Sequence, residues 1–267
     1  MRGQKPSLTS ALAAAVVAST MSVTAVKAAD CPREGTLGTP RILAVDAATA
    51  PRVGLKSFPK TLPLEDHEVV LTFDDGPWPR TTALVLAALT QECVHATFFL
   101  IGKNTAEHPE LARKIADQGH TVGHHTWQHR SLKRISFSAA GQEIDRGIRA
   151  DEMALHGVAT TVPSTPFFRF PGFESTTATL DLLQSRGIVV FGADLWASDW
   201  NEMTPRQELS LIVDRLKIAR KGIILFHDTK ARTAAMLPEF LRYLRDNHYR
   251  VVHVVPVSPG ADFDGVP

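Results

Sequence analysis

Stretches with the composition of buried strands alternate with helical patterns along most of this chain. The candidate strands are mostly continuous runs of Val, Ile, Leu and Phe, which is typical of strands buried on both faces. They cover residues 69–75, 96–102, 120–125, 167–172, 188–194, 222–227 and 250–255, and helical patterns lie between them near residues 81–92, 106–118, 138–156, 176–185, 205–220 and 232–246. This alternation predicts an α/β fold with a parallel sheet, either an open doubly wound sheet or a barrel. In both architectures ligands bind at the carboxyl ends of the strands.

The pattern over residues 205–220 is the clearest helix signal. Thr204 precedes it as an N-cap, Pro205 occupies the first turn, and Gln207 completes a capping box. Apolar residues then recur at helical spacing on one face. The chain therefore carries explicit start signals as well as hydrophobic periodicity for this helix.

The two ends of the chain differ from this alternating region. Residues 1–28 join a short basic region to an Ala-rich apolar stretch that ends in small residues, which predicts a cleaved secretory signal and an exported protein, periplasmic or extracellular. An uncleaved membrane anchor is the alternative, and the Ala-rich composition disfavours it. Residues 29–66 are rich in proline and are interpreted as an extended arm laid over a domain of residues 67–256. The Pro- and Gly-rich residues 257–267 are predicted to form a loose tail.

Composition narrows the class of protein further. The chain has 267 residues, of which 29 are basic and 28 acidic, so it lacks the basic surface of a nucleic-acid-binding or anionic-membrane-binding protein. Removal of the predicted signal would leave a length that suits a single barrel-type domain. Cys31 and Cys93 are the only cysteines. Export permits a disulfide between them, but the sequence gives neither their separation nor the oligomeric state.

Chemically reactive side chains follow the strands at the points where they end. Asp74 and Asp75 end the first candidate strand, just before Gly76-Pro77. An Asp pair is disfavoured inside a strand, because Asp competes for backbone hydrogen bonds and resists burial. Asp-Gly and Gly-Pro are also ordinary turn dipeptides, so the pair gains meaning only from the other strand ends. Those strand ends carry His125 and His129, Arg169, Asp199, and His227 with Asp228.

Two of these histidines have the spacing of metal ligands. His125 and His129 are four residues apart, which on a helical turn would put both imidazoles on one face. Two histidines and one carboxylate form a frequent catalytic zinc set with an open position for water. One aspartate of the pair could then bind the metal while the other stays free to accept a proton from water.

The remaining strand-end residues suggest acid–base chemistry. Arg169 lies in an apolar strand, where a buried cation costs several kcal/mol unless it is paired, so it is expected to pair with a carboxylate. His227 follows an apolar run at a strand end, where a general acid would be useful, although a structural core histidine is the usual alternative. Asp199 is a candidate to orient that imidazole.

These motifs, in this order, resemble the polysaccharide deacetylases of carbohydrate esterase family four, the NodB-homology domain. Thr-Phe-Asp-Asp-Gly-Pro at 72–77, His-Thr-x-x-His at 125–129 and Leu-x-His-Asp at 225–228 match the first, second and fifth motifs of the family. Asp199-Trp200 fits the fourth motif. The resemblance extends over residues 69–255, nearly the whole predicted domain.

The resemblance implies a distorted (β/α)7 barrel and a metal-dependent hydrolase that removes N-acetyl groups from poly- or oligosaccharides containing N-acetylglucosamine. It implies a divalent metal, zinc in most members, with Co²⁺ or Ni²⁺ as alternatives. The implied roles are Asp75, His125 and His129 as metal ligands, Asp74 as the general base oriented by Arg169, His227 as the general acid oriented by Asp199, and Gly172, Phe173, Trp200 and Leu225 as substrate-binding residues.

The third motif departs from the family pattern. Many members read Arg-Pro-Pro-Tyr, whereas this chain reads Arg-Phe-Pro-Gly-Phe at 169–173. In the family, the backbone N–H at the Tyr position helps to hold the oxyanion, and Gly172 retains that N–H. Arg130 also stands where Pro is frequent, and we expect this change to affect the wall of the substrate groove rather than the metal.

Other functions remain open from the sequence. The same machinery could act on O-acetyl esters such as acetylated xylan, or the chain could be an inactive carbohydrate-binding member of the fold. A two-histidine, one-carboxylate iron oxygenase shares the ligand set, but an acid–base pair outside that set favours hydrolysis. The motifs do not identify the polymer, which could be peptidoglycan, chitin fragments or an exopolysaccharide.

Overall fold

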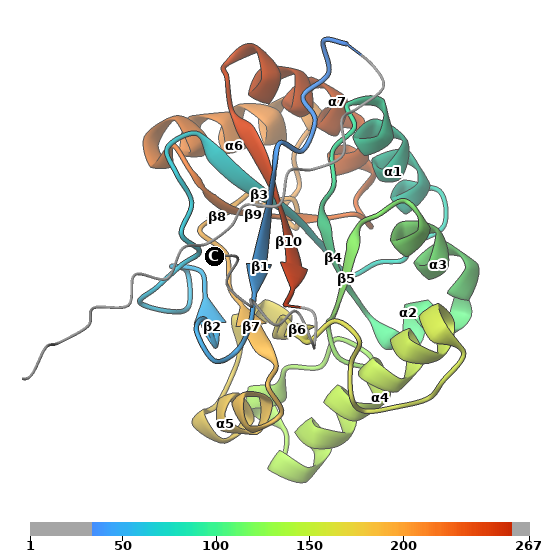
Figure 1. Cartoon of the computed structure of the whole chain (residues 1–267). Coiled ribbons are helices and arrows are strands. Elements are labelled where there is room, and N and C mark those ends of the chain that lie inside the picture. The colour runs from blue at the N-terminus through green and yellow to red at the C-terminus, as the bar shows by residue number, and fades with distance from the viewer. Residues whose placement is uncertain (1–33, 258–267) are drawn as a thin grey trace, which may run out of the picture.

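The computed structural model describes residues 34–257, and the predicted alternation of strands and helices is present in it. Figure 1 shows the strands at the centre with the helices arranged around them. The strands are β1 (Arg41–Val45), β2 (Arg52–Val53), β3 (Glu68–Asp74), β4 (Thr97–Leu100), β5 (Thr121–His124), β6 (Phe167–Phe168), β7 (Val189–Phe191), β8 (Leu195–Trp196), β9 (Gly222–His227) and β10 (Arg250–Pro256). The α-helices are α1 (Thr81–Gln91), α2 (Gly102–Glu107), α3 (Pro109–Asp117), α4 (Phe137–His156), α5 (Thr177–Ser185), α6 (Pro205–Ala219) and α7 (Ala231–Asp246).

Some predictions concern residues outside the described part of the chain. The predicted signal of residues 1–28 and all but the first residue of the predicted tail lie there. Cys93 is disulfide-bonded, whereas Cys31 also lies outside the described residues. Within residues 34–257, no helix is both long enough and apolar enough to cross a membrane.

The strands form a parallel sheet that curls into a distorted barrel. β3 is central, with β9 on one side and β4 on the other, and the sheet continues through β5, β6 and β7. After β7 the chain bends at Gly192 and enters β8, which pairs with β9. The Asp194 N–H donates to the Ile223 carbonyl at 2.9 Å within this crossing. The segment from β7 to β8 therefore brings the two ends of the sheet together.

Side chains along each strand alternate between two apolar layers. On β3, Val69, Leu71 and Phe73 belong to the cluster that packs against α1, α6 and α7. Val70 instead belongs to the cluster that also holds Phe99, Phe167 and Ile223 from neighbouring strands. The first layer lies between the strands and the helices, and the second fills the barrel, as a strand period of two requires.

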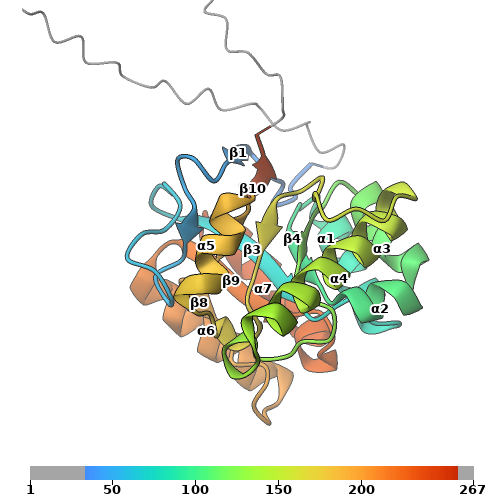
Figure 2. The same cartoon turned by 90° about the horizontal axis from the view of Figure 1, so that it is seen from below.

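The proline-rich arm is part of the sheet. β1 pairs with β10, as Figure 2 shows at one edge of the strands, and β2 pairs with β7. Leu62 and Leu64 of the arm are buried in the same cluster as the residues inside the barrel. The arm is thus packed into the barrel by strand pairing and by buried apolar side chains.

Two predicted elements differ from the structure. The helix predicted near residues 106–118 begins only at Pro109, as α3, and the separate helix α2 ends before it, because His108 precedes Pro109 and has φ −135° and ψ 57°, outside the helical region. The strand predicted over residues 167–172 is confined to β6, since Pro171 cannot donate to a ladder and begins a short 3₁₀ helix, Pro171–Phe173. Helix α6 starts as predicted, with Thr204 and Gln207 forming the capping box.

Candidate active site

The alternation of side chains along the strands also places side chains at the open end of the barrel. Asp74 shares a face of β3 with Val70 and Thr72, so its carboxylate points into the barrel. His227 stands in the same relation to Ile223 on β9. The inner face is therefore apolar at one end and carries ionisable groups at the carboxyl ends of the strands.

Arg169 occupies the interior beneath these groups and is fully buried. Its Nη1 donates to Asp74 Oδ1 at 2.7 Å and to Thr72 Oγ1 at 2.8 Å, and its Nη2 donates to the Gly192 carbonyl at 2.8 Å. The guanidinium lies over the Phe99 ring at 4.3 Å from the ring centre. The predicted pairing of Arg169 with a carboxylate is present, and the partner is Asp74.

Asp75 breaks the strand alternation, so two neighbouring carboxylates reach one cavity. Its φ is 77°, in the left-handed region, which turns its side chain toward the site instead of toward the helices. Gly76 follows because a Cβ there would lie 2.3 Å from Oδ2 of the buried Asp228. The Asp-Gly turn and the chemical role predicted for the pair are therefore compatible.

His125 and His129 meet Asp75 at the end of β5. Their Nε2 atoms lie 3.6 Å and 3.4 Å from Asp75 Oδ1. The expected helical turn is wrong, because Thr126 and His129 have φ of 67° and 59°, and the segment is an irregular turn. This turn still brings the two imidazole ring centres to 5.0 Å.

The three side chains fit a divalent metal. One ligand atom from each of Asp75, His125 and His129 lies within 4.8 Å of the others, and Asp75 Oδ1 is buried with no hydrogen-bond partner among the described residues. His125 Nδ1–H donates to the Arg169 carbonyl at 2.7 Å, which leaves the Nε2 lone pair facing the cluster. Burial lowers the pKa of His125 to about 3, so its imidazole is neutral, as a ligand must be.

His227 and Asp199 form a second pair on the other side of Asp75. His227 Nδ1–H donates to Asp199 Oδ1 at 2.7 Å, and the His227 backbone N–H donates to Oδ2 at 2.7 Å. Burial alone would lower the pKa of His227, but its hydrogen bond to Asp199 and the charges of Asp199, Asp75 and Asp74 outweigh burial and raise the pKa to about 9. His227 is thus a cation at neutral pH, with Nε2 on the side of Asp75.

A buried chain of side chains supports Asp199 from behind. Thr233 Oγ1 lies 2.9 Å from Asp199 Oδ2 and 2.9 Å from Glu208 Oε1. A hydroxyl carries one proton, so both contacts are hydrogen bonds only when one carboxyl is protonated. Burial raises the pKa of Glu208 to about 7, which makes Glu208 the protonated partner at neutral and lower pH. Thr233 then donates to Asp199.

Asp74 lies between the metal cluster and the His227–Asp199 pair. Burial raises its pKa, and the charges of Arg169 and His227 act in the opposite direction. Arg169 holds Oδ1, whereas Oδ2 lies 3.8 Å from His125 Nε2, on the side of the metal cluster. Asp74 is therefore a fixed carboxylate with one oxygen facing the site.

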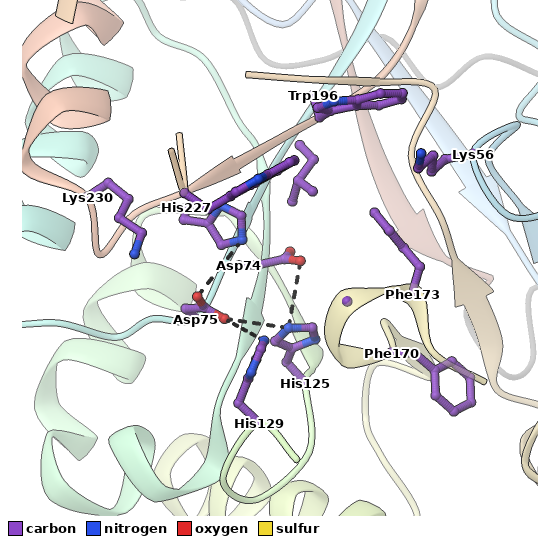
Figure 3. A pocket seen from close by; sticks show the side chains of 13 residues that line it. Lys56, Asp74, Asp75, His125, His129, Phe170, Phe173, Trp196, His227 and Lys230 are labelled. Carbon is purple, nitrogen blue, oxygen red and sulfur yellow. Dashed lines mark ion pairs between the residues drawn. The ribbon is translucent and has the colours of Figure 1, made fainter. Parts of the chain in front are cut away.

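These groups open into a cavity of about 380 Å³, whose side chains Figure 3 shows. The predicted residues divide into those that line the cavity and those behind it. Arg169 and Asp199 lie behind it, fully buried. The predicted residues that line it are Asp74, Asp75, His125, His129, Gly172, Phe173, Trp200, Leu225 and His227.

Four further lining residues were not predicted. Phe170 and Trp196 are neighbours of motif residues, so their place in the sequence was a usable signal. Lys230 follows His227 by three residues, in the turn before α7. Lys56 comes from the arm, and no pattern around it indicates a place in the site.

Comparisons with known proteins agree with this geometry. The sequence model of a family described as polysaccharide deacetylase matches residues 62–191. A chitooligosaccharide deacetylase from Rhizobium leguminosarum bv. trifolii is 32% identical over 61% of this chain and 73% of its own length. Chitin deacetylase 1 from Saccharomyces cerevisiae is 34% identical over 61% of this chain, which spans about half (52%) of the yeast protein. A peptidoglycan deacetylase from Bdellovibrio bacteriovorus superposes with a TM-score of 0.74 at 28% identity, covering 90% of this chain and 65% of that one.

Proposed function

This chain belongs to the polysaccharide deacetylase family, and we propose that it is an exported, metal-dependent hydrolase that removes N-acetyl groups from glycans containing N-acetylglucosamine and releases acetate. The observation that carries the proposal is the arrangement around Asp75. A three-residue metal cluster lies on one side of it and the His227–Asp199 pair on the other, with Asp74 held between them. Hydrolysis of an amide needs an activated water and a proton for the leaving amine, and this arrangement has a residue for each task.

The names of the relatives support this chemistry. They describe deacetylases of chitin, chitooligosaccharide and peptidoglycan, which share N-acetylated amino sugars. Export agrees with such polymers, which lie outside the cytoplasm, and it is inferred from the sequence pattern of residues 1–28.

The metal would be held by Asp75, His125 and His129, and two imidazoles with one carboxylate favour zinc, with Co²⁺ or Ni²⁺ as alternatives. When bound, such an ion lowers the pKa of a water and polarises a carbonyl oxygen. Asp74 Oδ2 faces the cluster and would accept the proton of the attacking water. Because Arg169 fixes Oδ1, Asp74 keeps this orientation without itself binding the metal.

The other groups would stabilise the reacting amide and its leaving group. His227 would give its Nε2 proton to the departing nitrogen, and Asp199 would keep its Nδ1 protonated and directed away from the cavity. Gly172 is the second residue of its 3₁₀ helix, where a backbone N–H has no acceptor within the helix. That N–H would donate to the oxyanion, and one such donor is typically worth about 3–4 kcal/mol. Leu225 and Trp200 would contact the acetyl methyl group.

The direct test is acetate release from a panel of acetylated glycans. We expect the exported protein to release acetate from N-acetylglucosamine oligomers or peptidoglycan, to lose this activity on chelation, and to regain it with Zn²⁺, Co²⁺ or Ni²⁺. Acetylated xylan in the same panel separates amide from ester hydrolysis. Release from xylan alone would overturn the proposal, and so would undiminished activity in protein shown by elemental analysis to be free of metal.

A further inference from the structure

Two lysines lie on opposite sides of the cavity. Lys56 comes from the loop after β2, and Lys230 comes from the turn between β9 and α7. Figure 3 shows Lys230 on the side of His227 and Asp75 and Lys56 beside Trp196 and Phe173, with Asp74 between the two sides. A glycan chain that crosses the reaction centre would pass both ammonium groups.

Backbone and ring contacts hold Lys56 at the cavity wall. Its backbone N–H donates to the Ala193 carbonyl at 2.7 Å, and its Nζ lies 4.4 Å from the centre of the Trp196 ring. The same loop is fixed by Asp194, which accepts from the Leu55 N–H at 2.8 Å. The ammonium is therefore placed over an aromatic face, and no carboxylate among residues 34–257 forms an ion pair with it.

Lys230 is positioned by the start of a helix. Its backbone N–H donates to the His227 carbonyl at 3.1 Å, and its own carbonyl accepts from the Ala234 N–H at 3.1 Å. Lys230 is the N-cap residue of α7, and the first turn of α7 contains no acidic residue. A cation at this end of a helix is disfavoured by the helix dipole. The chain therefore keeps a positive charge beside the cavity at a cost in stability.

The carboxylates of the site do not neutralise these lysines. Asp74 is paired with Arg169 at 2.7 Å, and Asp75 Oδ1 faces His125 and His129. Among the described residues, the ion pairs that contain a lysine are Lys103–Glu107 and Lys217–Asp214. Lys56 and Lys230 thus add two uncompensated positive charges to the rim of the cavity.

We propose that Lys56 and Lys230 form two cationic subsites that bind carboxylates on the sugars neighbouring the acetylated one, so that the substrate is an anionic N-acetylated glycan. This inference rests on the proposed deacetylase function and specifies its substrate class. A neutral N-acetylglucosamine chain would leave both ammonium groups without counter-charges. A glycan with a carboxylate on each side of the acetylated sugar would supply both counter-charges. The resulting gain in kcat/KM would appear chiefly as a lower KM, because neither lysine touches the reacting atoms.

Three β-1,4-linked glycan probes distinguish the effect of substrate charge on kcat/KM from the effect of substrate shape. The first is peptide-free peptidoglycan strands, in which lactyl carboxylates alternate with N-acetylglucosamine residues. The second is the same strands with the carboxylates converted to methylamides. The third is the N-acetylglucosamine hexamer. We expect kcat/KM for the anionic strands to exceed that for the methylamide strands by about tenfold at low salt, since two partly exposed ion pairs contribute about threefold each.

The variants Lys56→Gln and Lys230→Gln remove one charge each. Each is expected to lower the ratio of anionic to methylamide kcat/KM about threefold, through KM, and the double variant is expected to bring the ratio close to one. Lys60→Gln is the matched control, because Lys60 is an exposed lysine of the same arm that does not line this cavity. Raising NaCl from about 0.05 M to about 0.5 M is expected to shrink the ratio in the wild type and to leave it unchanged in the double variant.

Equal kcat/KM for anionic and methylamide strands would overturn the inference, and so would a ratio that both lysine variants leave unchanged. Calorimetric binding of the two strand forms keeps the inference testable if no acetate is released. Absence of acetate from every probe would refute the proposed function alone. Equal affinity of wild type and double variant for the anionic strands would refute the subsites alone.

Discussion

Asp74 and Asp75 are neighbours in the chain, yet their surroundings differ. Asp74 keeps the strand conformation and is held by Arg169 inside the barrel. Asp75 has a positive φ and faces two histidines, with a buried oxygen that has no hydrogen-bond partner in the described part of the chain. The sequence shows the pair and the candidate partners, but the conformation of Asp75 that separates them depends on the turn above Asp228 and is not visible in composition or periodicity.

Replacement of Arg169 by Met tests the buried pair at this scale. Met removes the donors to Asp74, Thr72 and Gly192 and leaves Asp74 buried without its hydrogen-bonded cation. We expect the free energy of unfolding to fall by about 3–5 kcal/mol, as when one partner of a buried pair is lost. Chemical denaturation measures this loss. In the double variant Arg169→Met with Asp74→Asn, which removes the stranded charge, part of the stability is expected to return, and strictly additive effects would contradict the pairing.

At the scale of elements, the predictable part of the fold is the set of long apolar segments. All seven predicted strands are present, because continuous Val, Ile, Leu and Phe runs mark strands covered on both faces. β1, β2 and β8 were not predicted, since they are stabilised by pairing with distant strands rather than by local pattern. Lys56 was not predicted for the same reason, because it reaches the cavity through the pairing of β2 with β7.

Besides strand pairing, the side chain of Asp194 joins the arm to β9 by hydrogen bonds. Asp194 Oδ1 accepts from the Leu55 N–H at 2.8 Å, and Oδ2 accepts from Thr61 Oγ1 at 2.7 Å and from the Ile223 N–H at 2.8 Å. We expect Asp194→Ala to destabilise the fold by about 1–3 kcal/mol, because it removes the acceptor of three hydrogen bonds, two of which are partly buried. It should also speed hydrogen exchange of the loop between β2 and Thr61.

An exposed ion pair on the same arm provides the control for Asp194. Arg52 Nη2 lies 3.2 Å from Asp181 Oδ1, and the Asp181 side chain is 65% exposed. Asp181→Ala is therefore expected to change stability by less than about 1 kcal/mol. Equal effects of the two substitutions on loop exchange would contradict the view that Asp194 fixes the arm.

At the scale of the whole molecule, a buried histidine cluster links stability to pH at the end of the barrel opposite the site. His95, His120 and His253 lie together, with ring centres 5.9 Å apart for His95–His120 and 5.2 Å apart for His95–His253. Burial, with repulsion from neighbouring histidines, lowers the pKa of His120 to about 3 and that of His253 to about 4. Both side chains are therefore neutral in the folded protein over most of the acidic range.

The lowered pKa values of His120 and His253 decide whether stability rises or falls with pH. The unfolded chain, with histidine pKa values of about 6.5, binds more protons than the folded chain below that pH. The stability from the neutral cluster is complete above about pH 6.5 and is lost as pH falls toward the folded values of about 3 and 4. We expect His120→Gln to reduce the slope of unfolding free energy against pH, between about pH 6 and 4, by about 1.4 kcal/mol per pH unit. An unchanged slope would show that His120 does not titrate with unfolding.

The central claim is that Asp74 acts as the general base and Asp75 as a metal ligand. Substitution of each aspartate in turn tests it directly. Asp74→Asn keeps the shape of the side chain and leaves the metal ligands intact, whereas Asp75→Asn alters a ligand. We predict that Asp74→Asn binds zinc with the wild-type stoichiometry and releases acetate at least about 100-fold more slowly, the typical contribution of a general base. Asp75→Asn is predicted to lose both zinc and activity. The measurement is zinc content by elemental analysis together with the rate of acetate release, for both variants. Near-wild-type deacetylation by Asp74→Asn, or loss of its zinc, would contradict the account.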